Sequence, residues 1–105
     1  KKIQDSFIQE NANSISNLMD DRVSIGIDEN TQTCSKNQAE IILKRFFTKH
    51  EVQAFYFSSN ESVMNQDGFY KAELVTNKFN FIVTILLIQD NQNWKIHRLT
   101  INKKT

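Results

Sequence analysis

The ionisable side chains of this 105-residue chain determine which reactions it is equipped to catalyse. General acid–base catalysis needs a carboxylate or an imidazole in an apolar pocket and a donor aimed at the developing oxyanion. Residues of suitable type are Asp28, His50, Tyr56, Glu73, His97 and Arg98. His97 shares strand parity with Leu99 and Ile101, so we expect it to face the same side. A single strand histidine among apolar neighbours is usually a hydrogen-bonded structural residue, and we therefore assign no catalytic residue.

The single cysteine, Cys34, is the candidate thiol nucleophile. It comes just before a predicted helix, whose dipole would lower the pKa of a thiol at that place. The alternative, which we favour, is that Cys34 has no chemical role and is simply a small residue ahead of a helix cap. A zinc site of the Cys/His kind would need Cys34 together with His50 and His97. Because His50 and His97 are far apart in the sequence, nothing in their spacing indicates convergence, and we predict no metal and no cofactor.

The composition excludes several classes of function. Two glycines are too few for a P-loop or a dinucleotide-binding fingerprint. The 13 basic and 12 acidic residues are interspersed and give a net charge of +1, whereas nucleic-acid binding needs a concentrated basic surface. No segment approaches the ~18 consecutive apolar residues of a membrane span. The length and the 39% hydrophobic content fit one globular domain, residues 1–105.

Two segments have the apolar spacing of amphipathic helices. Residues 5–19 are predicted to form the first helix. Residues 35–50 give the clearest local signal, because Ser35 and Gln38 fit a capping box at the helix start. The apolar stripe of this second helix consists of Ala39, Ile42, Leu43, Phe46 and Phe47.

The remaining periodic segments are predicted to be strands. They cover residues 22–27, 52–57, 69–76, 79–89 and 94–102, with a polar connector at 58–68 and turns at 77–78 and 90–93. Short polar turns between successive strands indicate an antiparallel meander. The predicted fold class is α+β, with two helices packed on the concave face of a curved, mainly antiparallel sheet.

The segment 79–90 is apolar on both faces, which is unusual for a strand with one face in water. We expect its odd residues to lie beneath the helices and Ile82, Thr84 and Leu86 to face outward. Charged residues on the neighbouring strands, including Arg98, would flank this outward stripe. An apolar centre with a charged rim is typical of a contact surface. The candidate dimer interface is therefore Ile82, Thr84, Leu86 and Arg98.

The order of elements and several motifs resemble the nuclear transport factor 2-like (cystatin-like) superfamily. More narrowly, the chain resembles a group of short bacterial domains of unknown function within it. In the second helix the resemblance is carried by Ser35, Lys36, Gln38, Ala39, Glu40, Leu43, Phe46 and Phe47. In the hairpin it is carried by Gly68, Tyr70, Leu74, Thr76, Phe79, Val83 and Leu87. Lys78 departs from the glycine that is usual at the hairpin tip.

The resemblance implies a cone-like fold in which the helices fill the hollow of a bent sheet. Members of the superfamily often dimerise through the outer sheet face. Many enclose a pocket in the cone, which is an active site in some and a binding site in others. The narrower group implies an exported or lipid-anchored bacterial protein without known activity, so we expect a periplasmic, extracellular or lipid-anchored location, with a signal segment that this sequence does not contain.

We therefore expect a non-enzymatic binding or accessory module that homodimerises through its outer sheet face. Another protein or a small apolar ligand is a further possible partner. The alternative is a small-molecule binder or an isomerase- or dehydratase-like enzyme that uses a pocket inside the cone. The candidate pocket residues for that alternative are Phe47, His50, Tyr56 and His97.

Overall fold

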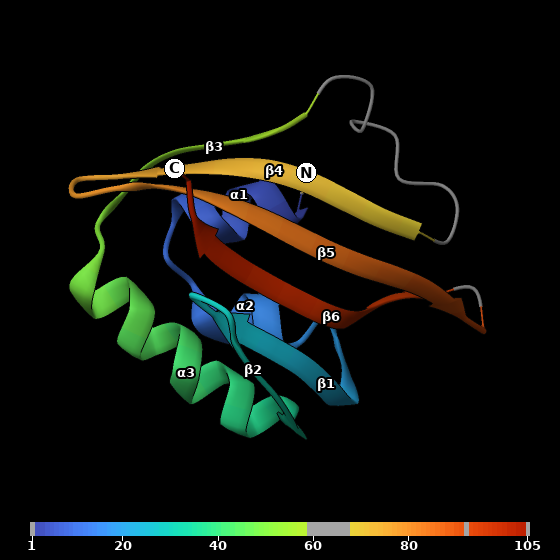
Figure 1. Cartoon of the computed structure of the whole chain (residues 1–105). Coiled ribbons are helices and arrows are strands. Elements are labelled where there is room, and N and C mark those ends of the chain that lie inside the picture. The colour runs from blue at the N-terminus through green and yellow to red at the C-terminus, as the bar shows by residue number, and fades with distance from the viewer. Residues whose placement is uncertain (1, 59–67, 92, 105) are drawn as a thin grey trace.

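The computed structural model describes residues 2–58, 68–91 and 93–104, which form three helices and a six-stranded sheet (Figure 1). The predicted polar connector at 58–68 falls almost entirely outside the described residues. The helices are α1 (Lys2–Ile8), α2 (Ala12–Ser16) and α3 (Lys36–Lys49). The strands are β1 (Met19–Ile27), β2 (Asn30–Ser35), β3 (Val52–Phe57), β4 (Gly68–Thr76), β5 (Asn80–Asp90) and β6 (Asn93–Lys103).

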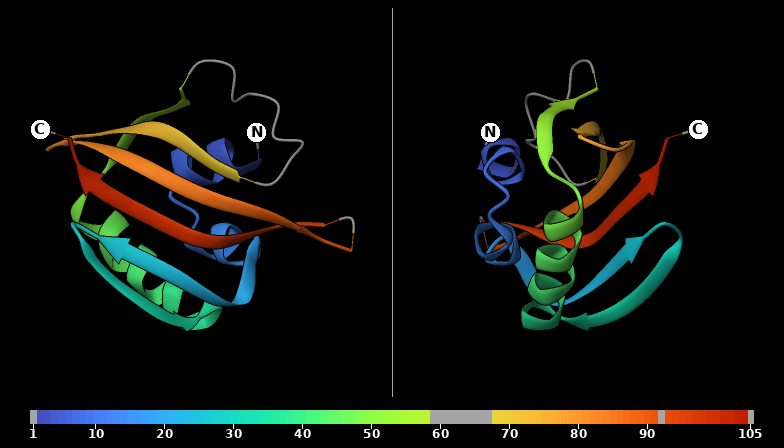
Figure 2. Two further views of the ribbon diagram at one scale, coloured as in Figure 1. Left: turned by 45° about the vertical axis from the view of Figure 1, so that its right-hand side comes forward. Right: turned by 90° about the vertical axis from the view of Figure 1, so that its left-hand side faces the viewer.

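The strands form one curved sheet in the order β2-β1-β6-β5-β4-β3. β1 runs parallel to β6, and every other pair of neighbours is antiparallel. Strands β3 to β6 follow one another both in the chain and in the sheet, which confirms the predicted meander. The three helices lie on one side of the curved sheet, as the right-hand view of Figure 2 shows. The predicted α+β class with a curved, mainly antiparallel sheet is confirmed.

The N-terminal segment forms two short helices, and the prediction of one helix over 5–19 is wrong. α1 ends at Ile8, and Glu10 has a φ of 55°, which a helix cannot contain. The side chain of Asn11 then begins α2 by accepting a hydrogen bond from the backbone N–H of Ser14 at 3.0 Å. The apolar spacing continues across this break, so periodicity does not distinguish two helices from one.

Residues 28–34 have no predicted element, but the structure has the edge strand β2 there. Cys34 is the only buried residue of β2, so the segment lacks the alternation that marks a half-buried strand. Asp28 and Glu29 form the two-residue turn between β1 and β2, with φ values of 52° and 71°. Such turns prefer Asn-Gly, Asp-Gly or Gly-Gly, and because glutamate stands in the second position here, the turn signal is weak.

Helix α3 begins as predicted. The side chain of Ser35 accepts a hydrogen bond from the backbone N–H of Gln38 at 3.1 Å, which satisfies a helix donor that would otherwise be unpaired. The buried face of α3 consists of Ala39, Leu43, Phe46 and Phe47. Helix α3 packs against α2, β1 and β2, whereas α1 packs against β3 and α2.

The turn between β4 and β5 shows why a lysine is tolerated at this hairpin tip. Neither Asn77 nor Lys78 has a positive φ, so the turn does not need glycine. Instead, the hydroxyl of Thr76 accepts from the backbone N–H of Phe79 at 3.1 Å and donates to the carbonyl oxygen of Phe79 at 2.6 Å. The buried Thr76 side chain therefore closes the turn.

A β-bulge in β6 changes which of its side chains face the core. Leu86 pairs with Arg98, but Leu87 pairs with Ile96, so His97 is an extra residue on β6. Ile96 is consequently fully buried although its parity differs from that of the buried Leu99 and Ile101. Strand parity across the bulge therefore does not predict the side that His97 faces.

Aromatic rings fill the space between the helices and the sheet. The ring of Phe7 on α1 stacks on that of Phe55 on β3, with centroids 4.6 Å apart, and meets the edge of Phe47 on α3 at 6.0 Å. Phe46 on α3 contacts Phe81 on β5 at 5.1 Å. All five rings are buried, so they join α1, α3, β3 and β5 in one core.

Phe7 is expected to be essential for docking the N-terminal helices. A helix of seven residues is unstable alone, so α1 depends on its packing. Phe7→Ala should lower the free energy of unfolding by about 3–5 kcal/mol, as measured by urea denaturation. The matched control Ile8→Ala, which truncates a side chain that is 45% exposed on the same helix, should change it by less than about 0.5 kcal/mol. Equal losses in the two variants would contradict this role.

Candidate functional site

The outer face of the sheet has apolar residues along β5 and charged residues on both sides. Directly paired residues on neighbouring antiparallel strands share a face, so the pairing of β4, β5 and β6 defines this surface. Its central rows are Glu73–Ile82–Asn102, Lys71–Thr84–Thr100 and Phe69–Leu86–Arg98. The predicted interface residues Ile82, Thr84, Leu86 and Arg98 thus lie together on one face. We call this surface the outer stripe, comprising Phe69, Ile82, Thr84, Leu86 and Ile88.

The two faces of β5 differ in burial. Phe81, Val83 and Ile85 are fully buried on the helix side, whereas Ile82, Thr84 and Leu86 are only half-buried. Phe69 is 60% exposed at the edge of the outer stripe, and Tyr56 on β3 is 52% exposed on the same face. The helices all lie on the opposite side (Figure 2). Within the described part of the chain, no helix covers the outer stripe.

The four predicted pocket residues lie in different parts of the molecule. Phe47 is buried in the aromatic core, and Tyr56 pairs with Glu73 on the outer face. The His50 ring contacts Phe81, which pairs with Lys103 near the end of β6. His97 lies on the same strand, six residues before Lys103. At the rise of a β-strand, this separation corresponds to roughly 20 Å. The structure therefore does not bring these four side chains into one pocket.

His50 follows the last turn of α3 and borders an open groove. Its Nδ1 lies 3.2 Å from the carbonyl oxygen of Phe46, and its ring stacks on the Phe46 ring with centroids 4.6 Å apart. Asp28, another candidate from the sequence, lines the same groove from the β1–β2 turn. These contacts fix the orientation of the imidazole at the surface.

The remaining acid–base candidates have structural partners or lie exposed. Nε2 of His97 is 3.6 Å from a carboxylate oxygen of Asp20, at the irregular start of β1. The carboxylate of Glu73 is 3.3 Å from Nζ of Lys104 and accepts a hydrogen bond from Asn80 at 3.0 Å. Arg98 is exposed on the outer face. None of these groups is fully buried.

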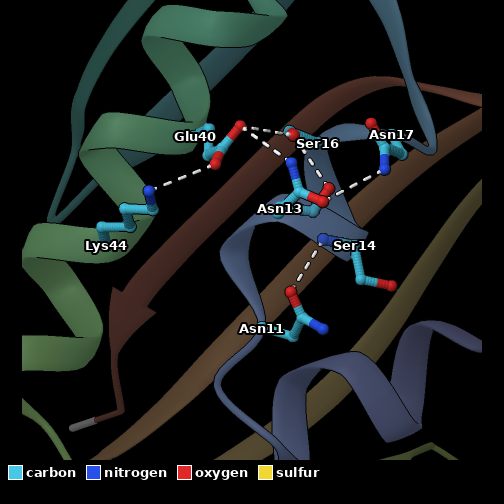
Figure 3. Close-up of polar contacts among 7 residues, drawn as sticks. All are labelled: Asn11, Asn13, Ser14, Ser16, Asn17, Glu40 and Lys44. Atoms are coloured by element: carbon cyan, nitrogen blue, oxygen red, sulfur yellow. Dashed lines mark hydrogen bonds and ion pairs between the residues drawn. The ribbon is translucent and has the colours of Figure 1, made fainter.

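A polar cluster between α2 and α3 was not identified from the sequence. Oε1 of Glu40 accepts from the hydroxyl of Ser16 at 3.1 Å and from the side-chain amide of Asn13 at 3.4 Å (Figure 3). Oε2 of Glu40 lies 3.4 Å from Nζ of Lys44. The sequence shows only the Glu40–Lys44 spacing, because Asn13 and Ser16 come from a distant segment. Glu40 thus joins the two helices.

The environment of Glu40 favours its charged form. Desolvation of the carboxyl opposes ionisation, but hydrogen bonds from Ser16, Lys44 and Asn13 outweigh it and lower the pKa of Glu40 below its ordinary value. A carboxylate with three donors has little capacity left for a substrate. We interpret the cluster as a structural clamp between α2 and α3.

Cys34 lies on β2 opposite Val23 and is buried. Burial raises the pKa of its thiol, and the nearby positive charge of Arg22 only partly offsets this effect. A thiol of this kind is mostly protonated at neutral pH and therefore a poor nucleophile. The structure thus favours the structural interpretation of Cys34.

Two further features bear on possible sites. Among residues 2–58, 68–91 and 93–104, no group of three or more His, Cys, Asp or Glu side chains is arranged to hold a metal ion. In the same residues, no helix is long and apolar enough to cross a membrane.

Comparison with known proteins places the chain in a family. Residues 1–102 match the family model described as "Domain of unknown function (DUF4783)". The crystal structure of a DUF4783 family protein from Bacteroides uniformis superposes with a TM-score of 0.89 at 23% identity, covering 99% of this chain and 95% of the other. The comparison with curated proteins gave no match.

Two more distant structures carry the expected fold. A domain of unknown function with a cystatin-like fold from Nostoc punctiforme has a TM-score of 0.73 at 8% identity, covering 99% of this chain and 72% of the other. A nuclear transport factor 2-like protein from Cytophaga hutchinsonii has a TM-score of 0.68 at 13% identity, covering 98% and 90%. The resemblance stated from the sequence is confirmed.

The Glu40 clamp makes stability depend on pH. The pKa of Glu40 is lower in the folded chain than in the unfolded chain, where it is about 4.3. The stabilisation by the Glu40 carboxylate is therefore complete above the unfolded-state pKa. It is lost as the pH falls through the folded-state pKa. Glu40→Gln should lower the melting temperature at pH 7 and reduce the further drop between pH 7 and pH 3. Glu51→Gln, at an exposed position, is the control, and an unchanged pH dependence in Glu40→Gln would contradict the clamp.

The thiol of Cys34 is expected to react slowly in the folded chain. Burial and a raised pKa both reduce the accessible thiolate. Labelling with an aromatic disulfide reagent at pH 8 should be at least about tenfold slower in buffer than in denaturant. In the control Cys34→Ala/Thr33→Cys, the thiol moves to the exposed neighbouring position and should react fast without denaturant. Fast labelling of native Cys34 would indicate a reactive thiol instead.

Proposed function

We propose, from the premise that the chain belongs to the DUF4783 family of domains of unknown function, that it is a non-enzymatic binding or accessory module. In this proposal, the chain homodimerises through the outer face of its sheet. The observation that carries the proposal is the outer stripe, an apolar surface on the central strand that no helix of the described chain covers.

The size of the outer face suits a dimer. Six strands spaced about 4.8 Å apart and roughly 25 Å long have a flat projection of roughly 700 Å², which is an upper bound for the contact because the outer face is convex. A specific protein interface buries about 800 Å² on each partner, and its centre is apolar while its rim is polar. The outer stripe supplies the apolar centre, and Lys71, Glu73 and Arg98 supply the rim.

The arrangement of side chains also suits two-fold symmetry. An axis parallel to β5 and above it places the β4 side of one copy over the β6 side of the other. Because Phe69, Leu86 and Arg98 share one row, Phe69 of one copy would then lie over Arg98 of the second copy. A guanidinium over an exposed aromatic ring gains a cation–π interaction. Leu86 would contact its symmetry mate at the axis.

The alternative of an enzyme or small-molecule binder inside the cone has less support. The described interior is occupied by packed rings, among them Phe7, Phe46, Phe47 and Phe55. Among the described residues, no aspartate, glutamate or histidine is fully buried. A proton-transfer site in the cone would need such a group beside apolar walls. We therefore make the binding module the proposed function.

Export to the periplasm or the cell surface stays a prediction that rests on the family resemblance. Fractionation of cells that carry the native gene, followed by detection with an antibody to this chain, would test it. Recovery of the protein in the cytoplasmic fraction would contradict export.

Leu86→Glu should convert the dimer into a folded monomer. The substitution places a charge at the centre of the outer stripe, where a dimer would leave it buried and unpaired. Sedimentation velocity at about 50 μM should show the wild-type chain as a dimer and Leu86→Glu at half that mass. Ile41→Glu is the control, because it places the same charge on a side chain that is 43% exposed on α3, on the opposite side of the sheet. A monomeric wild-type chain at this concentration would contradict the proposed homodimer.

A further inference from the structure

A groove of about 280 Å³ lies between the second half of α3 and the β1–β2 turn. It is on the helix side of the sheet, away from the outer stripe. Its lining residues are Ile27, Asp28, Ile42, Arg45, Phe46, Lys49 and His50. Three of these side chains, Ile27, Ile42 and Phe46, are apolar and at least half-buried, so they form a floor.

Arg45 and Lys49 place two positive charges on one wall of the groove. They stand four residues apart on α3, where like charges repel each other. The helix positions three and four residues from Arg45 hold Ile41, Ile42, Thr48 and Lys49, so no carboxylate of α3 is within reach.

The other two lysines of α3, Lys36 and Lys44, each have an ion pair. Lys36 lies 3.7 Å from Asp21, and Lys44 lies 3.4 Å from Glu40. Among the described residues, Arg45 and Lys49 form no ion pair within 4.0 Å. The two cations exceed the single carboxylate of Asp28 in the lining, so the groove has a net positive charge and an anion in it would relieve the repulsion between Arg45 and Lys49.

The opposite wall is held in an uncommon backbone conformation. Asp28 and Glu29 both have positive φ values, which aspartate tolerates but which are uncommon for glutamate. Three hydrogen bonds to β6 hold the turn. The Asp28 N–H donates to the Ile101 carbonyl at 2.9 Å, the Glu29 N–H donates to Oδ1 of Asn102 at 2.8 Å, and Oδ1 of Asp28 accepts from the Lys103 N–H at 3.2 Å. These hydrogen bonds fix the position of Asp28 on the wall of the groove.

The imidazole ring of His50 forms the end of the groove, and its contacts fix its orientation. The His50 imidazole stacks on Phe46, meets the edge of Phe81 at 5.1 Å and has Nδ1 at 3.2 Å from the Phe46 carbonyl oxygen. When Nδ1 carries the proton and donates to that carbonyl, Nε2 is an acceptor. The ring thus offers the groove a rigid apolar edge and one polar atom.

We propose that this groove binds a small organic monoanion, a carboxylate with a short apolar or aromatic body. The guanidinium of Arg45 and the ammonium of Lys49 bind the carboxylate, since a guanidinium matches its two oxygens. The body of the ligand lies on Ile27, Ile42 and Phe46. The negative charge of Asp28 on the opposite wall disfavours a dianion such as phosphate. The volume of about 280 Å³ lies at the lower end for ligand pockets and therefore selects a small molecule.

This proposal is independent of the dimer, because the groove and the outer stripe lie on opposite sides of the sheet. A monomeric chain would still contain every lining residue. Failure of one proposal therefore leaves the other standing.

The test is a titration of the full 15N-labelled chain with phenylacetate, followed by two-dimensional NMR. Saturable shifts are expected for the backbone amides of residues 27–29 and 42–50, with a dissociation constant in the millimolar range, of order 1 mM for a ligand of this size. The neutral analogue 2-phenylethanol and inorganic phosphate should each bind at least about tenfold more weakly.

Variants separate the charged wall from general electrostatics. Arg45→Gln/Lys49→Gln should weaken phenylacetate binding at least about tenfold, because two charge-assisted contacts are lost. Arg22→Gln/Lys36→Gln removes the same charge at the other end of α3 and should leave binding unchanged. Asp28→Asn keeps the oxygen that accepts from Lys103 but removes the opposing charge, so it should bind phenylacetate more tightly.

Four results would overturn the proposal. They are the absence of saturable shifts up to about 50 mM phenylacetate, equal binding of 2-phenylethanol, binding of phosphate as tight as that of phenylacetate, and unchanged affinity in Arg45→Gln/Lys49→Gln. All substituted side chains are exposed or at the surface, and the spectrum of each variant without ligand verifies that it is folded.

Discussion

The burial of one face of β5 beneath the helices is the interaction on which the rest of this structure depends. Phe81, Val83 and Ile85 are fully buried there, and the strand pairs along its length with β4 and β6. The two N-terminal helices have only seven and five residues, so they cannot be stable without packing on the rest of the fold, α1 on β3 and α2 on α3. The sheet in turn needs the helices, because a curved sheet with an uncovered inner face would expose its core. Helices and sheet are therefore stable only together.

The sequence predicts the parts of the fold whose signal is local and periodic. Helix α3 and the meander from β3 to β6 have caps, turns and apolar spacing that agree with one another. β2 lacks such a signal because all its residues except Cys34 are exposed. The break between α1 and α2 depends on Glu10 in a left-handed conformation, and the bulge at His97 depends on pairing between two strands. Neither is encoded in the spacing of one segment.

The candidate sites divide in the same way. The outer stripe follows from alternation along one strand, so Ile82, Thr84 and Leu86 could be grouped from the sequence. The pocket residues could not, because Phe47, His50, Tyr56 and His97 come from elements whose relative placement only the fold determines. The same reason hides the groove, whose walls come from the β1–β2 turn and from α3. The sequence gives only a weak signal for the groove. Lys49 follows Arg45 by four residues, and no carboxylate stands three or four residues from Arg45 on the helix.

The outer stripe and the groove consist of side chains that are not fully buried in the core. The two surfaces lie on opposite sides of the sheet. Most of the apolar stripe of α3 is buried against the sheet and the N-terminal helices, so only Ile42 and part of Phe46 contribute apolar surface to the groove. β5 has apolar residues on both faces, and the helices cover only one of them. A dimer formed through the outer stripe would therefore bury the second face of β5 while leaving both grooves open to solvent. If both proposals hold, assembly and ligand binding use opposite sides of the sheet and share no residue that could couple the two events.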